Sequence, residues 1–206
     1  MTVDAVVFDI GNVLIEWQPE RFYDRVVGEA RRRQMFATIN LHAMNDRVDR
    51  GEVWRDVIVE TAHAHPEFAN DIMIWHDRWI EMAAPAIDHS VRLLRALRNR
   101  GIPVFSLTNF GRETFEVARV EYPFLEEFDR SYISGHLEVI KPDEGIYAAV
   151  EADCGYPASG LLFTDDRAEN IDAAAARGWQ THKFEGSEGW AERLVLEGLL
   201  NREEAR

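Results

Sequence analysis

Acidic side chains end two apolar segments that are typical of buried parallel strands. Asp9 closes the run AVVFD, and Asp165 and Asp166 close GLLFTDD near the other end of the chain. Because the carboxyl ends of parallel strands share one edge of a sheet, these three carboxylates are expected to meet there. They would repel one another strongly unless a cation lay between them. An oxygen ligand set without His or Cys indicates a hard divalent metal, most simply Mg²⁺.

Three further polar residues are expected at the same edge. Thr108 and Asn109 end the apolar run IPVFSLTN, and Lys141 precedes a predicted helix. The hydroxyl of Thr108 and the ammonium of Lys141 would bind an anion, such as a phosphate, beside the metal. Some of the residues at this edge also have an ordinary explanation. Asp166 would make a good helix cap, and a lone lysine is usually a solvated surface residue.

The elements that must position these residues alternate between strand and helix. Apolar runs predict buried strands at 5–9, 102–109, 160–166 and, more weakly, 180–184. Helical periodicity with glycine or proline at the ends predicts helices at 89–101, 142–155 and 166–178. This alternation predicts an α/β fold with a doubly wound, Rossmann-like parallel sheet.

The segment from Pro19 to Pro85 has a different pattern, amphipathic and helical with no good strand. We therefore predict a core domain formed by 1–17 and 88–206, and a helical cap, 18–87, inserted after the first strand and packed over the carboxyl edge of the sheet.

Two groups of cap residues could face a substrate or serve the fold alone. Trp75 and Trp79 are spaced for one helix face, which suits packing as well as stacking on a sugar. A polar cluster could contact the non-phosphate part of a substrate or form a solvated helix end; its members are His42, Asn45, Arg47, Asp49 and Arg50.

Composition excludes several classes of partner. The formal net charge of −14 argues against nucleic-acid or anionic-membrane surfaces, which need clustered basic residues. No apolar run approaches the roughly 18 residues of a membrane helix, and no signal peptide is recognisable. The single cysteine, Cys154, cannot form an internal disulfide, so a reducing, cytoplasmic location is expected.

Four motifs, in their order and approximate spacing, resemble those of the haloacid dehalogenase superfamily. They are Asp9-Ile-Gly-Asn-Val, Thr108-Asn109, Lys141-Pro142 and Thr164-Asp165-Asp166. Each is weak alone, but together they cover the chain from end to end. FDIGNVL, YPFLEEFD and DDRAENI are most similar to the branch of glucose-1-phosphate phosphatases, and to the amino-terminal phosphatase domain of some epoxide hydrolases.

The resemblance implies roles for individual residues. Asp9 would attack phosphorus and form an aspartyl-phosphate that water then hydrolyses. The main-chain carbonyl of Gly11 would ligate Mg²⁺ together with Asp9 and the acidic pair Asp165 and Asp166. Thr108, Lys141 and the main chain around Asn109 would hold the phosphoryl group.

Gly11 departs from the commoner pattern of this superfamily, in which a second aspartate at that position acts as general acid and base. Losing such a group costs on the order of 10²–10⁴-fold in rate. Either another residue substitutes, with Glu16 or a cap residue as candidates, or a good leaving group such as that of a sugar-1-phosphate needs no acid.

The expected function is that of a Mg²⁺-dependent phosphatase acting on small phosphorylated metabolites, sugar phosphates first among them. Two alternatives remain open: a haloacid dehalogenase using the same aspartate, and a catalytically weak protein that binds phosphometabolites. The sequence allows a monomer or a homodimer.

Overall fold

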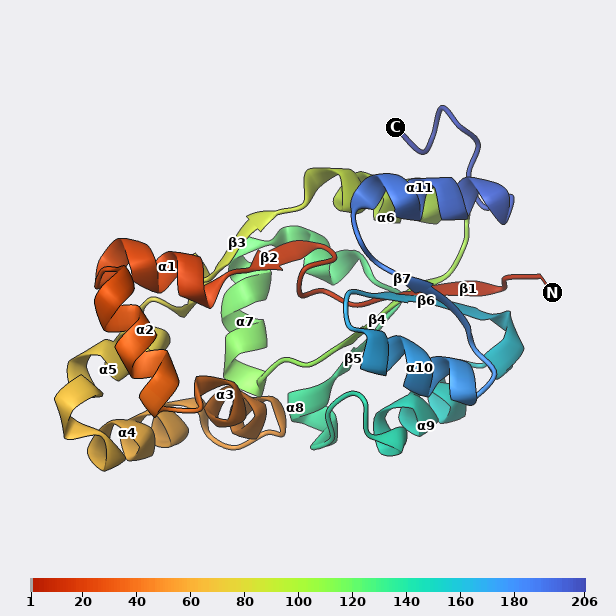
Figure 1. Ribbon diagram of the computed structural model, residues 1–206. Helices are drawn as coiled ribbons and strands as arrows, with labels where there is room; N and C mark the ends of the chain where they lie inside the picture. The colour runs from red at the N-terminus through yellow and green to blue at the C-terminus, as the bar shows by residue number, and fades with distance from the viewer. Residues whose placement is uncertain (1) are drawn as a thin grey trace.

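Five parallel strands form the centre of the molecule. The computed structural model describes residues 2–206 and places these strands in the order β5-β4-β1-β6-β7 (Figure 1). Their bounds are β1 Ala5–Phe8, β4 Val104–Thr108, β5 Arg130–Ile133, β6 Leu161–Asp165 and β7 Gln180–Lys183. The strand order is that of a doubly wound sheet with crossover connections, so the predicted α/β fold class is confirmed.

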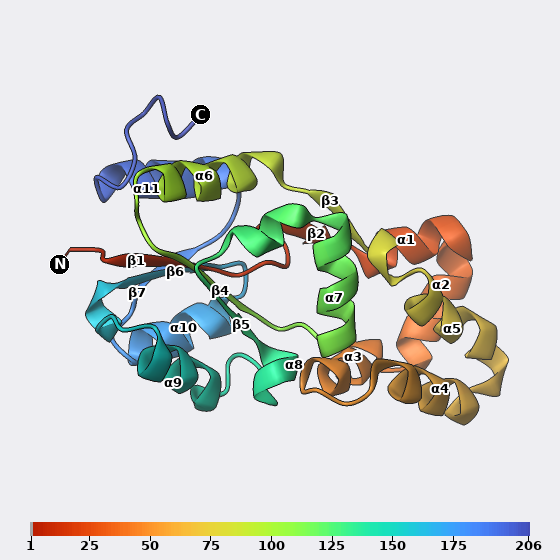
Figure 2. The same cartoon turned by 180° about the vertical axis from the view of Figure 1, so that it is seen from behind.

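Helices cover both faces of this sheet (Figures 1 and 2). α6 (Asp88–Asn99) and α11 (Ser187–Leu196) lie together on one face, and α9 (Glu144–Asp153) and α10 (Ala168–Ala176) lie on the other. Alternate residues of β1 enter two separate clusters of buried side chains, Val6 and Phe8 in one and Ala5 and Val7 in the other. Burial on both faces explains why the strands are continuous apolar runs.

A helical insert separates β1 from the rest of the core. It contains α1 Pro19–Val26, α2 Glu29–Thr38, α3 Leu41–Asp49, α4 Trp54–Ala64 and α5 Ala69–Asp77. In Figure 1 these helices lie beyond the carboxyl ends of the core strands. The chain enters and leaves the insert through an antiparallel pair, β2 (Ile15–Trp17) and β3 (Ala83–Ala86).

The remaining helices and turns complete the chain. They are α7 Arg112–Glu121, α8 Ser134–Leu137 and the 3₁₀ turns Pro66–Phe68, Trp79–Glu81, Pro123–Glu127 and Ala158–Gly160.

Sequence patterns located most of the core and missed its shorter strands. The four predicted strands are confirmed as β1, β4, β6 and β7, and the three predicted helices as α6, α9 and α10. The expectation of no strand between Pro19 and Pro85 was wrong at its end, where β3 pairs with β2. β5 was missed because its sequence, RSYI, begins with two exposed polar residues at the edge of the sheet. The division at residues 18 and 87 stays a prediction.

Across residues 2–206, none of the helices has the length and apolar character needed to cross a bilayer.

Candidate active site

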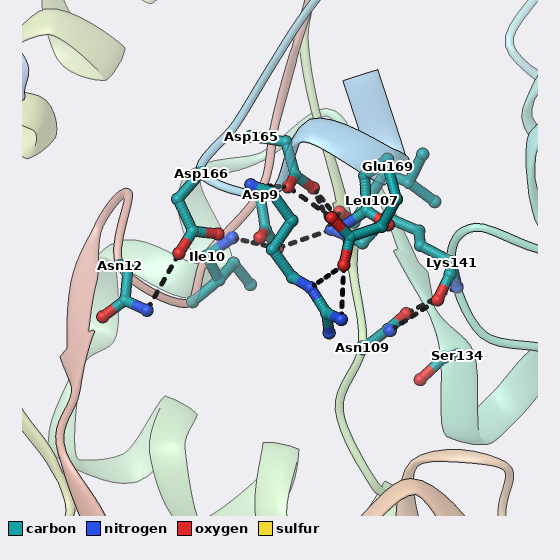
Figure 3. A network of polar contacts seen from close by, with 12 residues as sticks. Asp9, Ile10, Asn12, Leu107, Asn109, Ser134, Lys141, Asp165, Asp166 and Glu169 are labelled. Carbon is teal, nitrogen blue, oxygen red and sulfur yellow. Dashed lines mark hydrogen bonds and ion pairs between the residues drawn. The ribbon is translucent and has the colours of Figure 1, made fainter. Parts of the chain in front are cut away.

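Five of the predicted polar residues converge at the carboxyl edge of the sheet (Figure 3): Asp9, Asn109, Lys141, Asp165 and Asp166. Phe8 of β1 is in register with Thr164 of β6, so Asp9 and Asp165 follow on neighbouring strands. The main-chain N–H of Asp9 donates to the carbonyl of Thr164 at 2.9 Å, which extends the strand pairing by one residue. Thr108 ends β4 on the other side of β1 and is buried.

Lys141 links these strands through a buried ammonium group. Its Nζ lies 2.8 Å from Asp9 Oδ1 and 2.7 Å from Asp165 Oδ2, and donates to the carbonyl of Leu107 at 2.8 Å. Only 2% of the Lys141 surface is exposed, so the alternative of a solvated surface lysine was wrong. Burial alone would lower the pKa of Lys141, but the two carboxylates outweigh it and raise the pKa above its ordinary value.

Asn109 fixes the main chain of Lys141 through two reciprocal hydrogen bonds. Its Oδ1 accepts from the Lys141 N–H at 2.8 Å, and its Nδ2 donates to the Lys141 carbonyl at 3.0 Å. The side chain of Asn109 is therefore occupied in positioning the lysine. The sequence interpretation assigned Asn109 only to the phosphate and did not foresee this contact.

Asp165 is fully buried and surrounded by donors. Oδ1 accepts from the N–H of Arg167 at 2.8 Å and from Asn170 Nδ2 at 2.9 Å. Oδ2 accepts from Lys141 and, at 3.0 Å, from Asn170 Nδ2 as well. Both oxygens of Asp165 therefore have protein partners.

Asp166 is half-buried and more open than Asp165. Its Oδ2 accepts from Asn12 Nδ2 at 3.0 Å, and Asn12 Oδ1 accepts in turn from the N–H of Trp17 at 2.9 Å. α10 begins at Ala168 after the N-cap position Arg167, so the alternative of Asp166 as its N-cap residue was wrong. Burial raises the pKa of Asp166, and the Asn12 hydrogen bond partly opposes it.

The three carboxylates are close enough to share a cation. One oxygen each from Asp9, Asp165 and Asp166 lies within 4.8 Å of the other two. Burial raises the pKa of Asp9, an effect that Lys141 opposes and the neighbouring Asp165 strengthens. A hard divalent cation would offset this accumulation of negative charge, so the residues fit Mg²⁺.

A cavity of about 440 Å³ opens above these groups, lined by residues of both the core and the insert. Asp9, Gly11, Thr108, Asn109, Lys141 and Asp166 form part of its lining. Trp17, Trp75, Trp79 and Phe110 contribute an aromatic part of the wall, and Trp17 contacts both of the other tryptophans. Trp75 and Trp79 therefore both pack within the insert and face the cavity.

The predicted polar cluster of the insert divides into two groups. His42, Asn45 and Asp49 line the cavity. Arg47 and Arg50 do not; Arg47 pairs with Glu52 and Glu60, and Arg50 pairs with Asp143.

Two residues of the site lacked a recognisable signal in the sequence. Asn12 connects the loop after β1 to Asp166, and Asn170 lies one turn into α10, where its amide reaches Asp165. Asn12 has a φ of 55°, a left-handed conformation that asparagine tolerates better than most residues. Its place directly after Asp9-Ile-Gly11 was the only hint available.

Comparisons with known proteins agree with this arrangement. Sesquiterpene phosphatase astK from Aspergillus oryzae is 25% identical over 177 residues, which are 86% of this chain and 87% of that protein. Drimenol cyclase drtB from Aspergillus calidoustus is 27% identical over 94 residues, 46% of this chain but only 18% of the much longer relative.

Among solved structures, the HAD family enzyme bt-2542 from Bacteroides thetaiotaomicron superimposes with a TM-score of 0.74 at 22% identity, covering 94% of this chain and 99% of that one. The same enzyme has been solved in complex with magnesium and inorganic phosphate. The sequence profile of the haloacid dehalogenase-like hydrolases matches residues 3–178. The chain therefore belongs to the haloacid dehalogenase-like hydrolases.

Proposed function

We propose that the protein is a Mg²⁺-dependent phosphatase of small phosphorylated metabolites that works through an aspartyl-phosphate on Asp9. The observation that carries this proposal is the contact of one buried ammonium, Lys141, with both Asp9, which lines the cavity, and the fully buried Asp165. The phosphatase name of the astK relative and the magnesium and phosphate bound by bt-2542 support it.

Asp9 is held in a fixed orientation for attack on phosphorus. Its Oδ1 accepts from the N–H of Ile10 at 2.7 Å and contacts Lys141 Nζ, which leaves Oδ2 without a hydrogen-bond partner among the described residues. Attack forms the bond from the Asp9 carboxylate to phosphorus and breaks the bond to the leaving oxygen. Thr108 and Asn109 line the cavity, and the Thr108 hydroxyl and the main-chain N–H of Asn109 would bind the phosphoryl oxygens, as the sequence suggested. Positioning of this kind contributes much of such catalysis.

For the metal, the hydrogen bonds favour Asp9 and Asp166 as the direct carboxylate ligands. Asp165 already accepts from donors at both oxygens, whereas Asp166 Oδ1 has no hydrogen-bond partner in the described chain. Asp165 would then act by fixing Lys141 or by binding a ligand water, and the Gly11 carbonyl would complete the protein ligands. Bound Mg²⁺ would neutralise charge between Asp9 and the phosphate.

The predicted sugar-phosphate substrate remains a proposal, supported by the polar cavity residues Asn45, Asp46 and His42. A terpenyl phosphate is a second candidate, because Trp17, Trp75 and Trp79 offer apolar surface and a relative is a sesquiterpene phosphatase. Both would place the phosphate on Asp9 and the remainder of the substrate against the insert.

Of the two other predicted activities, dehalogenation fits the site less well. A dehalogenase needs no cation, and the three clustered carboxylates would then repel one another and destabilise the fold without serving the reaction. A weak phosphometabolite-binding protein would share every contact described here and differ only in turnover.

The test is phosphate release from matched panels of sugar phosphates, nucleotides and terpenyl phosphates. It is run with Mg²⁺, with a chelator, and with Asp9→Asn, and halide release from 2-haloacids is measured alongside. We expect release that requires both Mg²⁺ and Asp9. No release from any phosphate, together with a Mg²⁺-dependent rise in melting temperature, would favour the binding protein instead.

A further inference from the structure

Position 11 provides no side chain that could give a proton to the leaving group. Gly11 lines the cavity beside Asp9, and a Cβ built on it would meet no atom within 4 Å. If Asp9 attacks a phosphate ester as proposed above, the departing oxygen needs a proton unless it is already a stable anion. A carboxylic acid elsewhere on the cavity wall could supply it.

Five carboxylates line this cavity, and two of them, Asp9 and Asp166, belong to the nucleophile and the metal cluster. Glu16, one of the substitutes expected from the sequence, is paired with Arg21 at 2.8 Å. Asp46 is exposed to solvent. Asp49, at the end of α3, is only 8% exposed and has no ion-pair partner in residues 2–206. An acid that must keep its proton near neutral pH needs these two properties.

We infer that Asp49 is the general acid and base of this phosphatase, in place of a side chain at position 11. In the first step Asp9 forms its bond to phosphorus, the ester bond breaks, and the Asp49 proton passes to the leaving oxygen. In the second step the Asp49 carboxylate takes a proton from water. The water oxygen bonds to phosphorus, the bond from phosphorus to Asp9 breaks, and inorganic phosphate leaves. This inference rests on the proposed phosphatase function.

The side chain and main chain of Asp49 are both anchored. Asn45 Nδ2, one turn earlier on α3, donates to Asp49 Oδ2 at 2.8 Å. The Asp49 carbonyl accepts from Ser134 Oγ at 2.7 Å, and Ser134 Oγ accepts from the N–H of Phe110 at 2.9 Å. These bonds connect the end of α3 to the loop that follows Thr108, on the core side of the cavity.

Two glycines, Gly51 and Gly111, allow this close approach between insert and core, and Gly135 allows a similar approach within the core. A Cβ at Gly51 would lie 2.7 Å from the Gly135 carbonyl, and a Cβ at Gly111 would lie 2.5 Å from Val48 Cγ1. A Cβ at Gly135 would lie 2.7 Å from the N–H nitrogen of Arg112. Backbone contacts this tight fix the position of Asp49 relative to the phosphate-binding loop.

The electrostatic surroundings keep Asp49 protonated. Burial, together with the charges of Asp46 and Asp9, raises its pKa to about 8, although hydrogen bonds from Gly111 and Asn45 partly oppose this rise. Arginines on the packed elements are engaged elsewhere: Arg47 with Glu52 and Glu60, Arg50 with Asp143, and Arg112 with Glu138.

The experiment compares Asp49→Asn with wild type on two kinds of phosphate ester. With an alkyl phosphate, whose leaving oxygen needs a proton, we expect kcat to fall about 10²-fold or more. With p-nitrophenyl phosphate the first step needs no acid. The variant should then release one equivalent of nitrophenol per active site in a fast burst, followed by slow turnover, because hydrolysis of the aspartyl-phosphate still lacks its base.

The most discriminating part of the experiment places a carboxylate beside the nucleophile, at position 11. Gly11 has space for a side chain and a φ outside the left-handed region, so Gly11→Asp is sterically acceptable. The double variant Gly11→Asp/Asp49→Asn should have at least tenfold more alkyl phosphatase activity than Asp49→Asn alone. Wild type should also lose alkyl phosphatase activity above about pH 8, because Asp49, whose pKa is raised to about 8, then loses its proton. The pH profile of Asp49→Asn should lack this decrease. The matched control is Asp56→Asn, an exposed carboxylate of the insert outside the cavity.

A merely structural Asp49 gives different results. Its loss would slow the first turnover of both esters equally, produce no burst, and not respond to an aspartate at position 11; any one of these in a variant that melts normally overturns the inference. If wild type itself releases no phosphate from any ester, the proposed function fails first, and the two failures are thereby distinguished.

Discussion

The core and the insert face each other across one cavity but are built by different means. On the core side, charged groups are buried and tied to the main chain: Lys141 donates to the Leu107 carbonyl, and Asp165 accepts from the Arg167 N–H. On the insert side, Trp75 and Trp79 contribute to the cavity wall, and most charged groups pair at the surface, as Arg47 does with Glu52. Chemistry that needs fixed charges suits the first side, and discrimination among leaving groups suits the second.

Asp49 is an exception to this difference between insert and core. It belongs to the insert by sequence, yet it is buried and anchored to the core loop through Ser134. A catalytic group on the insert would couple the fit of a substrate to the delivery of a proton.

The largest effect is expected from the nucleophile. Asp9→Asn keeps the shape of the side chain but removes the attacking carboxylate, so kcat should fall by at least about 10⁴-fold. Steady-state phosphate release with Mg²⁺ measures it. Residual activity within tenfold of wild type would show that another group attacks phosphorus.

The next effect concerns stability of the core side. Lys141→Met leaves Asp9 and Asp165 buried without their cation, which should cost about 3–5 kcal/mol of unfolding free energy in the absence of metal. The control is Lys183→Met, whose ion pair with Glu185 is exposed, and which should cost far less. Urea unfolding monitored by circular dichroism gives both values. Equal losses in the two variants would contradict the account.

A smaller, pH-dependent effect is expected at Asp49. Its folded pKa, about 8, lies above the ordinary 3.8, so the unfolded chain loses this proton first as pH rises. The contribution of protonated Asp49 to stability is complete below about pH 4 and is lost as pH approaches 8. Asp49→Asn, which cannot ionise, should therefore gain stability over wild type by about 1 kcal/mol per pH unit between pH 5 and 7. If the urea midpoints of wild type and Asp49→Asn change in parallel between pH 5 and 7, Asp49 is ionised in the folded protein.

The smallest effect is expected on the aromatic wall. Trp17 is half-buried at the cavity and contacts Trp75 and Trp79. Trp17→Leu should raise KM about tenfold for the preferred substrate, roughly 1.4 kcal/mol, because ring contacts with the leaving group are lost. Inhibition by inorganic phosphate, which does not reach the wall, serves as the internal control and should hardly change.

The sequence revealed the site residues that are positioned by the strands of the sheet. Asp9, Thr108 and Asp165 each end an apolar strand, and parallel strands carry such residues to one edge wherever the loops lie. Lys141 was expected at this edge because it precedes a predicted helix, and the family resemblance supported the same position. By composition alone it looked like a surface residue.

The remainder depends on contacts that no local pattern encodes. Asn12 and Asn170 act through side-chain hydrogen bonds across the fold, the first to a partner 154 residues away. Asp49 looked like one member of a polar helix end until tight packing of Gly111 against Val48 and of Gly51 against Gly135 showed that it is buried. Such burial is a property of packed elements, and one sequence does not display it.

The most direct test of the account is to trap the covalent intermediate. Asp49→Asn, mixed with p-nitrophenyl phosphate and Mg²⁺ and quenched in acid within the burst, should carry one phosphoryl group on the peptide containing Asp9, as detected by mass spectrometry. Addition of Asp9→Asn to this variant should abolish the modification. A phosphoryl group on another residue, or turnover with no protein-bound phosphate at any time point, would contradict nucleophilic attack by Asp9.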